Sequence, residues 1–381
     1  MALFCSLLNL AACRTTNAVS TNSTNPTTMV TPDTLTPVQR ANACTFDLFK
    51  QVCAQSPAHD PKNIFLSPLS AFMALDIARQ GADGETLQEM AFLPSVQPET
   101  TNQLKIANSM WVQPTFKVEP SFLAACEPFG MEIYNQWIKA KDVNSWAAKK
   151  TNNKIRNLLS DPLPETLRMI LLNAIYFKAE WEDEFDKHST RDQKFYPTIA
   201  PAHNVKMMHR QGHMRYAENE YAQFLELPYK DCPYAMDIVL PKDSMSVEEM
   251  MKKSRLDALN FTYPEVVLSL PKVKMEYQCS LKQALNGLGI HLAFGQGANF
   301  SRLSKKEDVW IDDVVQKSFL AVDEAGTEAA AVTAVIMVGR AICPVKPEPK
   351  YMQVDHPFLL MLRDVETGLI LFIGKIEDIK G

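Results

Sequence analysis

The chain of 381 residues contains none of the short motifs around which common enzyme sites are built. It has no GxSxG, no HExxH, no P-loop and no GxGxxG. His209 and His213 are four residues apart, but Gly212 interrupts any helix there, so we expect a solvated loop and no metal. The acidic segment 180–188 is typical of a charged turn, and no carboxylate pair stands out as a general acid and base. We therefore expect neither an enzyme nor a cofactor.

Strong charge and long apolar runs are also absent. The net charge is -5 and there is no basic tract, which argues against nucleic acid as a partner. No apolar run reaches the roughly 18 residues that a membrane-spanning helix needs. With 46% hydrophobic and 22% charged residues, the composition is that of a globular protein with a large core.

The eight cysteines include no CxxC pair. Cys44 and Cys53 fall on one expected helix, about 13 Å apart along its axis and on opposite faces, so they cannot bridge each other. We interpret most of the cysteines as small buried hydrophobic residues.

The N-terminus differs from the rest of the chain. A short apolar run ends in Leu10-Ala11-Ala12-Cys13, which resembles the processing box of bacterial lipoproteins. We expect a signal peptide over residues 1–12, lipidation of Cys13, a flexible Thr/Ser/Pro-rich linker over 13–37 and a folded domain over 38–381. The protein would then be secreted or held at the cell envelope, touching a membrane only through the lipid. An ordinary secretion signal or a misassigned start remains open, because a basic n-region is missing.

Helical patterns dominate early and strand patterns late. Thr36 is a plausible cap of a helix reaching residue 55, and Pro68 starts a second helix that Gly81 ends. An amphipathic helix is expected over 143–159, and the apolar run 168–181 predicts a strand buried on both faces. Further strands and a C-terminal hairpin around 366–368 follow, so the order favours an α+β fold.

Five segments, in order along the chain, resemble the serpin family of serine protease inhibitors. They are NIFLSPLSAFMAL (63–75), LLNAIYFKAEWEDEF (171–185), LSLPKVKMEYQCSLKQALNGLGI (268–290), DEAGTEAAAVTA (323–334) and DHPFLLMLRDVETGLILFIGKI (355–376). The resemblance implies a serpin fold over about 38–379, with helices around a large mixed central sheet. It identifies 322–344 as the reactive loop, which a target protease cleaves and which then inserts into the sheet and traps the acyl-enzyme.

The resemblance also assigns the hinge of this loop, which comprises Glu324, Gly326, Thr327, Glu328, Ala329, Ala330 and Ala331. From Thr327, alternate residues would point into the sheet, and through Met337 they are all uncharged and none is proline. A buried charge would cost several kcal/mol and proline would remove a ladder hydrogen bond, so the segment suits insertion.

Counting from Gly326 as in the family places the cleaved bond at Arg340-Ala341, in a loop similar to that of antithrombin. Arginine suits the acidic pocket of trypsin-like proteases, and Arg-specific cysteine proteases are an alternative. A shift of one residue would make Gly339 or Ala341 the specificity residue and favour elastase-like targets. A non-inhibitory serpin that binds a ligand or partner is the competing function, although the small, neutral inward residues argue against it.

Trp181 matches the family's tryptophan at the top of the central sheet. Gln316 stands where family members commonly have histidine, and Ser67, Ser70 and Asn173 are its expected neighbours. Because glutamine does not titrate, we expect weak pH dependence there. The segment between Met90 and Asn108 is short, and residues 93–103 carry no Lys or Arg. We therefore expect no heparin activation, and a monomer whose partner is the protease alone.

Overall fold

The computed structural model of the protein describes residues 35–56, 59, 62–98, 101–242, 245–254, 260–306, 309–327 and 348–379. The first described helix begins as the sequence predicts. Thr36 accepts from the backbone N–H of Gln39, and the Gln39 side chain accepts from the backbone N–H of Thr36, which completes a capping box.

Seven α-helices are described. They are α1 (Pro37–Ala54), α2 (Pro68–Gly81), α3 (Gly84–Glu89), α4 (Pro120–Cys126), α5 (Ala140–Lys150), α6 (Val247–Lys253) and α7 (Lys282–Gly287). Proline at the first position of α1 and α2 is favourable because the missing N–H would be unpaired there in any case. In this part of the chain, no helix is both long and apolar enough to cross a membrane.

The described strands form three sheets. The large sheet has the order β3 (Glu132–Asn135), β2 (Leu104–Val112), β4 (Met169–Phe177), β13 (Ile311–Val322), β14 (Gly326–Thr327), β5 (Ala179–Glu180), with β12 (Val273–Ser280) also on β13. The second has the order β1 (Ile64–Leu66), β17 (Ile370–Ile376), β16 (Phe358–Asp364), β10 (Tyr234–Pro241), β9 (Ala222–Pro228), β8 (Arg215–Glu218). The third has the order β15 (Lys350–Gln353), β11 (Glu265–Pro271), β7 (His203–His213), β6 (Arg191–Phe195).

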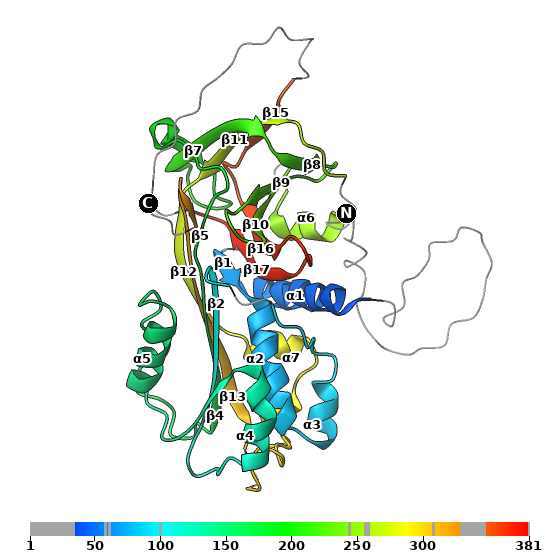
Figure 1. Cartoon of the computed structure of the whole chain (residues 1–381), viewed down its shortest axis with the longest axis vertical. Coiled ribbons are helices and arrows are strands. Elements are labelled where there is room, and N and C mark those ends of the chain that lie inside the picture. The colour runs from blue at the N-terminus through cyan, green and yellow to red at the C-terminus, as the bar shows by residue number, and fades with distance from the viewer. Residues whose placement is uncertain are drawn as a thin grey trace, which may run out of the picture.

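The large sheet is covered on both faces over much of its length. Figure 1 shows α5 on one side and α1, α2 and α7 on the other. Trp146 of α5 packs with Trp111 and Leu172 of the sheet, while Phe72 and Leu75 of α2 belong to the core on the opposite face. Every residue of β4 is buried, as the continuous apolar run predicts. The α+β architecture expected from the sequence, with helices around a large mixed sheet, is therefore confirmed.

Two local expectations are wrong. The helix expected over 143–159 ends at Lys150, because Asn152 and Asn153 adopt left-handed backbone conformations with φ of 50° and 64°. The solvated loop expected around His209 and His213 is strand β7, in which His209 pairs with Ser269 of β11. Gly212 excludes a helix there but is compatible with a strand, and the apolar residues fill the buried face.

The described cysteines are free thiols: Cys44, Cys53, Cys126, Cys232 and Cys279. Burial raises the pKa of Cys44 to about 11 and that of Cys53 to about 12. These two side chains therefore remain protonated at neutral pH and act as packing groups, as expected for α1.

Candidate functional site

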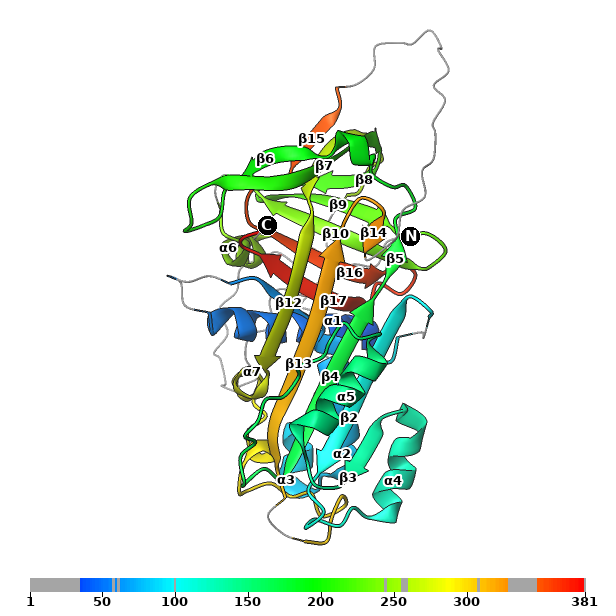
Figure 2. The ribbon, with the colours of Figure 1, turned by 90° about the vertical axis from the view of Figure 1, so that its left-hand side faces the viewer.

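The central feature of the candidate site is the upper end of the large sheet, where β4 and β13 separate. Below this point the two strands are parallel neighbours, paired from Met169 with Ile311 to Ile175 with Ser318. Above it, β14 lies between β13 and β5 and is antiparallel to both (Figure 2). A strand continuing in the direction of β14 would run antiparallel to both β4 and β13. We call residues 323–327, which are the described start of the predicted loop and include β14, the hinge segment.

Gly326 allows β14 to approach β5 closely. Its φ is +155°, a conformation that L side chains rarely adopt. A Cβ added here would lie 2.2 Å from the backbone oxygen of Ala179 and 2.7 Å from the Cα of Glu180. Glycine at this position is therefore required by the contact between the two strands as well as by its own backbone conformation.

Thr327 is the last described residue of the hinge segment, and its side chain points into the protein. The residue is 2% exposed, and its Oγ1 lies 2.5 Å from the hydroxyl oxygen of Tyr229. Burial raises the pKa of Tyr229, so its hydroxyl stays protonated and forms a neutral hydrogen bond with Thr327. The sequence prediction for Thr327 concerns the loop after its insertion into the sheet and stays a prediction.

Trp181 joins the hinge segment to the neighbouring sheet. Its indole Nε1 donates to the carbonyl of Asp323 at 2.9 Å, and its backbone N–H donates to the carbonyl of Ala325 at 2.9 Å. The ring stacks on Tyr229 with a centroid distance of 4.5 Å and contacts Phe185 edge-on. Trp181 therefore positions the start of the hinge segment through two hydrogen bonds and an aromatic stack.

Glu324 is held by two polar side chains. Its Oε2 accepts from Lys272 Nζ at 2.6 Å, and its Oε1 accepts from the Thr190 hydroxyl at 2.8 Å. Burial by itself raises the pKa of Glu324, but the hydrogen bonds from Lys272 and Thr190 outweigh it and the pKa lies below its usual value. Glu324 is therefore a charged anchor that ties the hinge segment to the loop ahead of β12 and to the segment ahead of β6.

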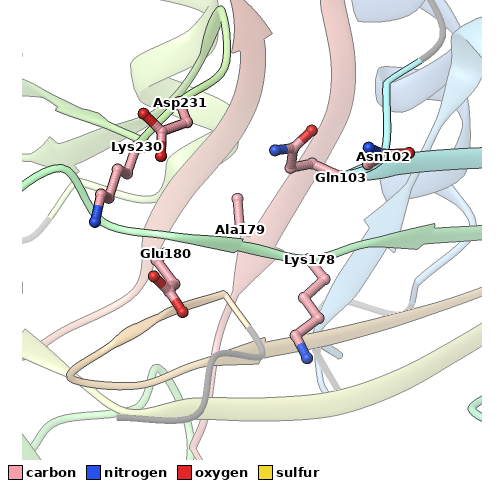
Figure 3. Close-up of a pocket in the computed structure, with 7 residues that line it drawn as sticks. All are labelled: Asn102, Gln103, Lys178, Ala179, Glu180, Lys230 and Asp231. Atoms are coloured by element: carbon pink, nitrogen blue, oxygen red, sulfur yellow. The ribbon is translucent and has the colours of Figure 1, made fainter. Parts of the chain in front are cut away.

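A small cavity of about 260 Å³ adjoins β5 at this end of the sheet. Figure 3 shows that the side chains of Lys178, just ahead of β5, and of Glu180 point to one side of the chain and that of Ala179 to the other. Lys230 and Asp231 complete a lining with charges of both signs. The volume is below that of an ordinary ligand pocket, and we assign no ligand to it.

The four polar residues expected at the centre of the sheet lie together where β4 and β13 pack against the start of α2. The Gln316 amide donates through Nε2 to Asn173 Oδ1 at 2.6 Å and to the Ser67 carbonyl at 2.9 Å. Its Oε1 accepts from the Ser67 N–H at 2.8 Å. Asn173 in turn donates to the Ser70 hydroxyl. Gln316 and Asn173 sit on adjacent strands, so parting β4 from β13 must break their hydrogen bond.

Asn108 is a member of this network that the sequence analysis missed. It lies opposite Asn173 on β2, and its Oδ1 accepts from Asn173 Nδ2 and, at 3.1 Å, from the Ser70 hydroxyl. The available signal was an asparagine within a mostly apolar predicted strand, since a buried polar side chain requires a partner. Ser67, Ser70, Asn108, Asn173 and Gln316 together form what we call the central polar network.

The remaining predicted residues lie outside the described part of the chain. They are Cys13, Glu328, Ala329, Ala330, Ala331, Arg340 and Ala341. Between α3 and β2, residues 91–98 and 101–103 contain no helix, in line with the short segment noted in the sequence. Among the described residues, no group of three or more His, Cys, Asp or Glu side chains is arranged to hold a metal ion.

Comparison with known proteins agrees with this geometry. The family model described as Serpin (serine protease inhibitor) matches residues 39–379. An uncharacterized serpin-like protein of Thermococcus kodakarensis is 34% identical over 90% of this chain and 86% of its own length. Iripin-8 of Ixodes ricinus is 32% identical over 85% of this chain and 90% of its own. The crystal structure of Tengpin, a thermophilic serpin in the native state, has 29% identity and a TM-score of 0.80, covering 93% of this chain and 97% of that one.

Proposed function

This chain belongs to the serpin family, and from that premise we propose that it inhibits trypsin-like serine proteases as a suicide substrate. Cleavage at Arg340-Ala341 would free the segment after Thr327 to enter the large sheet between β4 and β13. The protease, still joined to Arg340 as an acyl-enzyme, would be carried along and trapped before deacylation. Arg340 and Ala341 are assigned from the sequence, since both lie outside the described residues.

The observation that supports insertion most directly is the position of β14. It already pairs with β13 through Val322 and Thr327, and with β5 through Ala179 and Thr327. Since β14 is antiparallel to both neighbours, extending it requires no reversal of the chain. Below β14, β4 and β13 are bonded directly to each other, so the space between them is closed until they part.

The energetics favour insertion once the loop is cut. A new strand would replace one ladder between β4 and β13 by two ladders, a net gain of about a dozen hydrogen bonds at roughly 0.5–1.5 kcal/mol each. The gain is on the order of 10 kcal/mol, comparable to the stability of a whole domain, and ordering the loop subtracts from it. The uninserted state must then be held by a kinetic barrier, and the central polar network lies where that barrier would arise.

Arg340 determines the proposed target. Its guanidinium can pair with the carboxylate in the specificity pocket of a trypsin-like protease. Arg-specific cysteine proteases are a second candidate target, because they also select arginine and form an acyl intermediate. If the true bond is shifted by one residue, elastase-like proteases become the targets.

The test is to mix the full chain with trypsin and to separate the products on a denaturing gel. We expect a complex that survives denaturation and a released C-terminal fragment that begins at Ala341. Arg340→Ala should abolish the complex with trypsin. Simple cleavage with fully active trypsin would refute inhibition and favour a non-inhibitory serpin, and a fragment starting elsewhere would refute the assigned bond.

Our inference about the location of the protein depends on Cys13 alone. We infer that the chain is processed before Cys13, lipidated there and held at the cell envelope, with residues 13–37 as a spacer. The inference is supported by the Leu10-Ala11-Ala12-Cys13 box. Mass spectrometry of the N-terminal peptide should find an acylated Cys13, and Cys13→Ser should release the protein from the membrane fraction. An unmodified Cys13 in the mature protein would contradict this.

A further inference from the structure

A second cavity lies where the six-stranded and four-stranded sheets meet, at the end of the molecule that carries β15 (Figure 1). Its volume is about 740 Å³, within the range of small-molecule sites. The lining comes from four parts of the chain: the segment after β6, the start of β9, the end of β10 with residues just ahead of α6, and β15 with the connection to β16. None of these residues belongs to the hinge segment or to the central polar network. We call this second cavity the intersheet cavity.

Two exposed tyrosines flank the intersheet cavity. Tyr196 is 51% exposed and Tyr351 is 68% exposed, and both line it from different elements. The segments that carry them are held by hydrogen bonds. Tyr196 donates its backbone N–H to the carbonyl of Asp355 at 2.7 Å, and the side-chain Nε2 of Gln223 donates to the carbonyl of Tyr351 at 2.8 Å. Two large aromatic rings left in water beside a cavity lined by Leu240 and Met245 offer stacking surface for a flat, apolar ligand.

One basic side chain among the lining residues of the intersheet cavity is Lys242. Its ammonium donates to Glu218 Oε2 at 2.9 Å and to the carbonyl of Asn219 at 2.9 Å. An ammonium group has three N–H donors, so one of them is left for an acidic group on a ligand. Asp355 also lines the cavity, and its Oδ1 lies 2.9 Å from Nδ1 of His356. Burial lowers the pKa of His356, but its hydrogen bonds to Asp355 and to the Pro241 carbonyl outweigh this and raise it, which favours an ion pair with Asp355.

From these observations we propose that the intersheet cavity binds a small, flat aromatic acid. The ring would lie between Tyr196 and Tyr351, and its carboxylate or sulfonate would face Lys242. The proposal concerns a site separate from the hinge segment and does not depend on protease inhibition. It commits to an aromatic anion rather than a neutral apolar molecule, because the Lys242 ammonium lines the cavity and keeps one N–H donor beyond those that bind Glu218 and the Asn219 carbonyl.

The test uses the full chain and two matched probes, 1-naphthalenesulfonate and neutral 1-naphthalenemethanol, titrated by isothermal calorimetry. We expect one saturable sulfonate site per chain and weaker binding of the alcohol. Tyr351→Ala should weaken sulfonate binding about tenfold through the lost ring contact. Lys242→Met should weaken sulfonate binding to a similar extent but leave the alcohol unchanged, and Lys242→Arg should restore the preference for the anion.

The matched control is Tyr263→Ala. Tyr263 has the same exposed fraction as Tyr351, 68%, but stacks on His213 and does not line the cavity. The Tyr263→Ala variant should therefore bind the sulfonate as tightly as the unchanged chain does. Tyr351→Phe, which keeps the ring, should also retain binding, and a melting curve without probe establishes that each variant is folded.

Three results would each overturn the proposal: no saturable sulfonate binding, equal losses in Tyr263→Ala and Tyr351→Ala, or no effect of Lys242→Met. If Tyr351→Ala fails to fold, the comparison of Lys242→Met with Lys242→Arg decides the matter, because both alter a partly exposed side chain. Equal binding of the sulfonate and the alcohol in all variants would mean non-specific apolar adsorption and would overturn the proposal as well.

Discussion

At Gly326 a single methyl group would collide with the neighbouring strand. We predict that Gly326→Ala destabilises the intact protein by about 1–3 kcal/mol, because the added Cβ lies 2.2 Å from the Ala179 oxygen and the backbone must leave its φ of +155°. Urea denaturation measures the change. Gly130→Ala is the matched control: Gly130 has a φ of +65° but open space where the Cβ would lie. An equal loss in both variants would show that the close approach to β5 has no energetic role.

At Glu324 the expected effect depends on pH. The pKa of Glu324 is lowered from 4.5 in the folded state, so its charge contributes stability above pH 4.5 that is lost as the pH falls through the lowered value. We predict that Glu324→Gln is less stable than the unchanged protein at pH 7, and that the difference shrinks below pH 4.5. Denaturation curves across this range measure it, with Glu165→Gln, an exposed glutamate in the segment ahead of β4, as control. A difference independent of pH would contradict the ion pair with Lys272.

At the scale of the strands, Asn108 extends the central polar network from β4 and β13 to β2. We predict that Asn108→Ala destabilises the protein by about 1–3 kcal/mol, because it leaves the buried donors of Asn173 and Ser70 without their acceptor. A weaker network should also let β4 and β13 separate more readily. Denaturation measures the first effect, and loss of inhibitory activity during mild heating measures the second. Asn204→Ala, an exposed asparagine on β7, should change neither.

A second prediction at the scale of the strands concerns Thr327 of β14. Thr327 is buried against Tyr229, so an arginine there would place a charge inside the sheet at a cost of several kcal/mol. We expect Thr327→Arg to be cleaved by trypsin at Arg340 without forming the stable complex, whereas Thr327→Ser should still form it. The fraction of chain in the complex, measured on a denaturing gel, distinguishes the two. A full yield of complex from Thr327→Arg would exclude insertion of this segment.

At the scale of the whole molecule, cutting the loop should make the protein more stable. One added strand in the large sheet, on the order of 10 kcal/mol, corresponds to a rise in melting temperature of about 20 °C or more. Scanning calorimetry of the intact protein and of protein clipped at Arg340-Ala341 makes the comparison. Identical melting temperatures would show that cleavage does not stabilise the protein, and the proposed trapping would then have no source of free energy.

Much of the fold follows from local patterns. The Thr36 capping box, the start of α2 at Pro68 and the fully buried strand β4 were predicted correctly because caps, proline and continuous apolar runs act within a few residues. The prediction for β7 was wrong because Gly212 excludes a helix without indicating what replaces it, and only pairing with β11 makes the segment a strand.

By itself, the sequence determined the order of the elements, the family, and the small, neutral residues that suit a segment for burial in a sheet. The tertiary structure decided which distant groups meet. It brought Asn108 to Asn173 and Ser70, set Thr327 against Tyr229, and gathered Tyr196, Tyr351 and Lys242 around one cavity. The physical reason is that caps and burial patterns depend on neighbours in sequence, whereas hydrogen-bond networks and cavities depend on strands paired across more than a hundred residues.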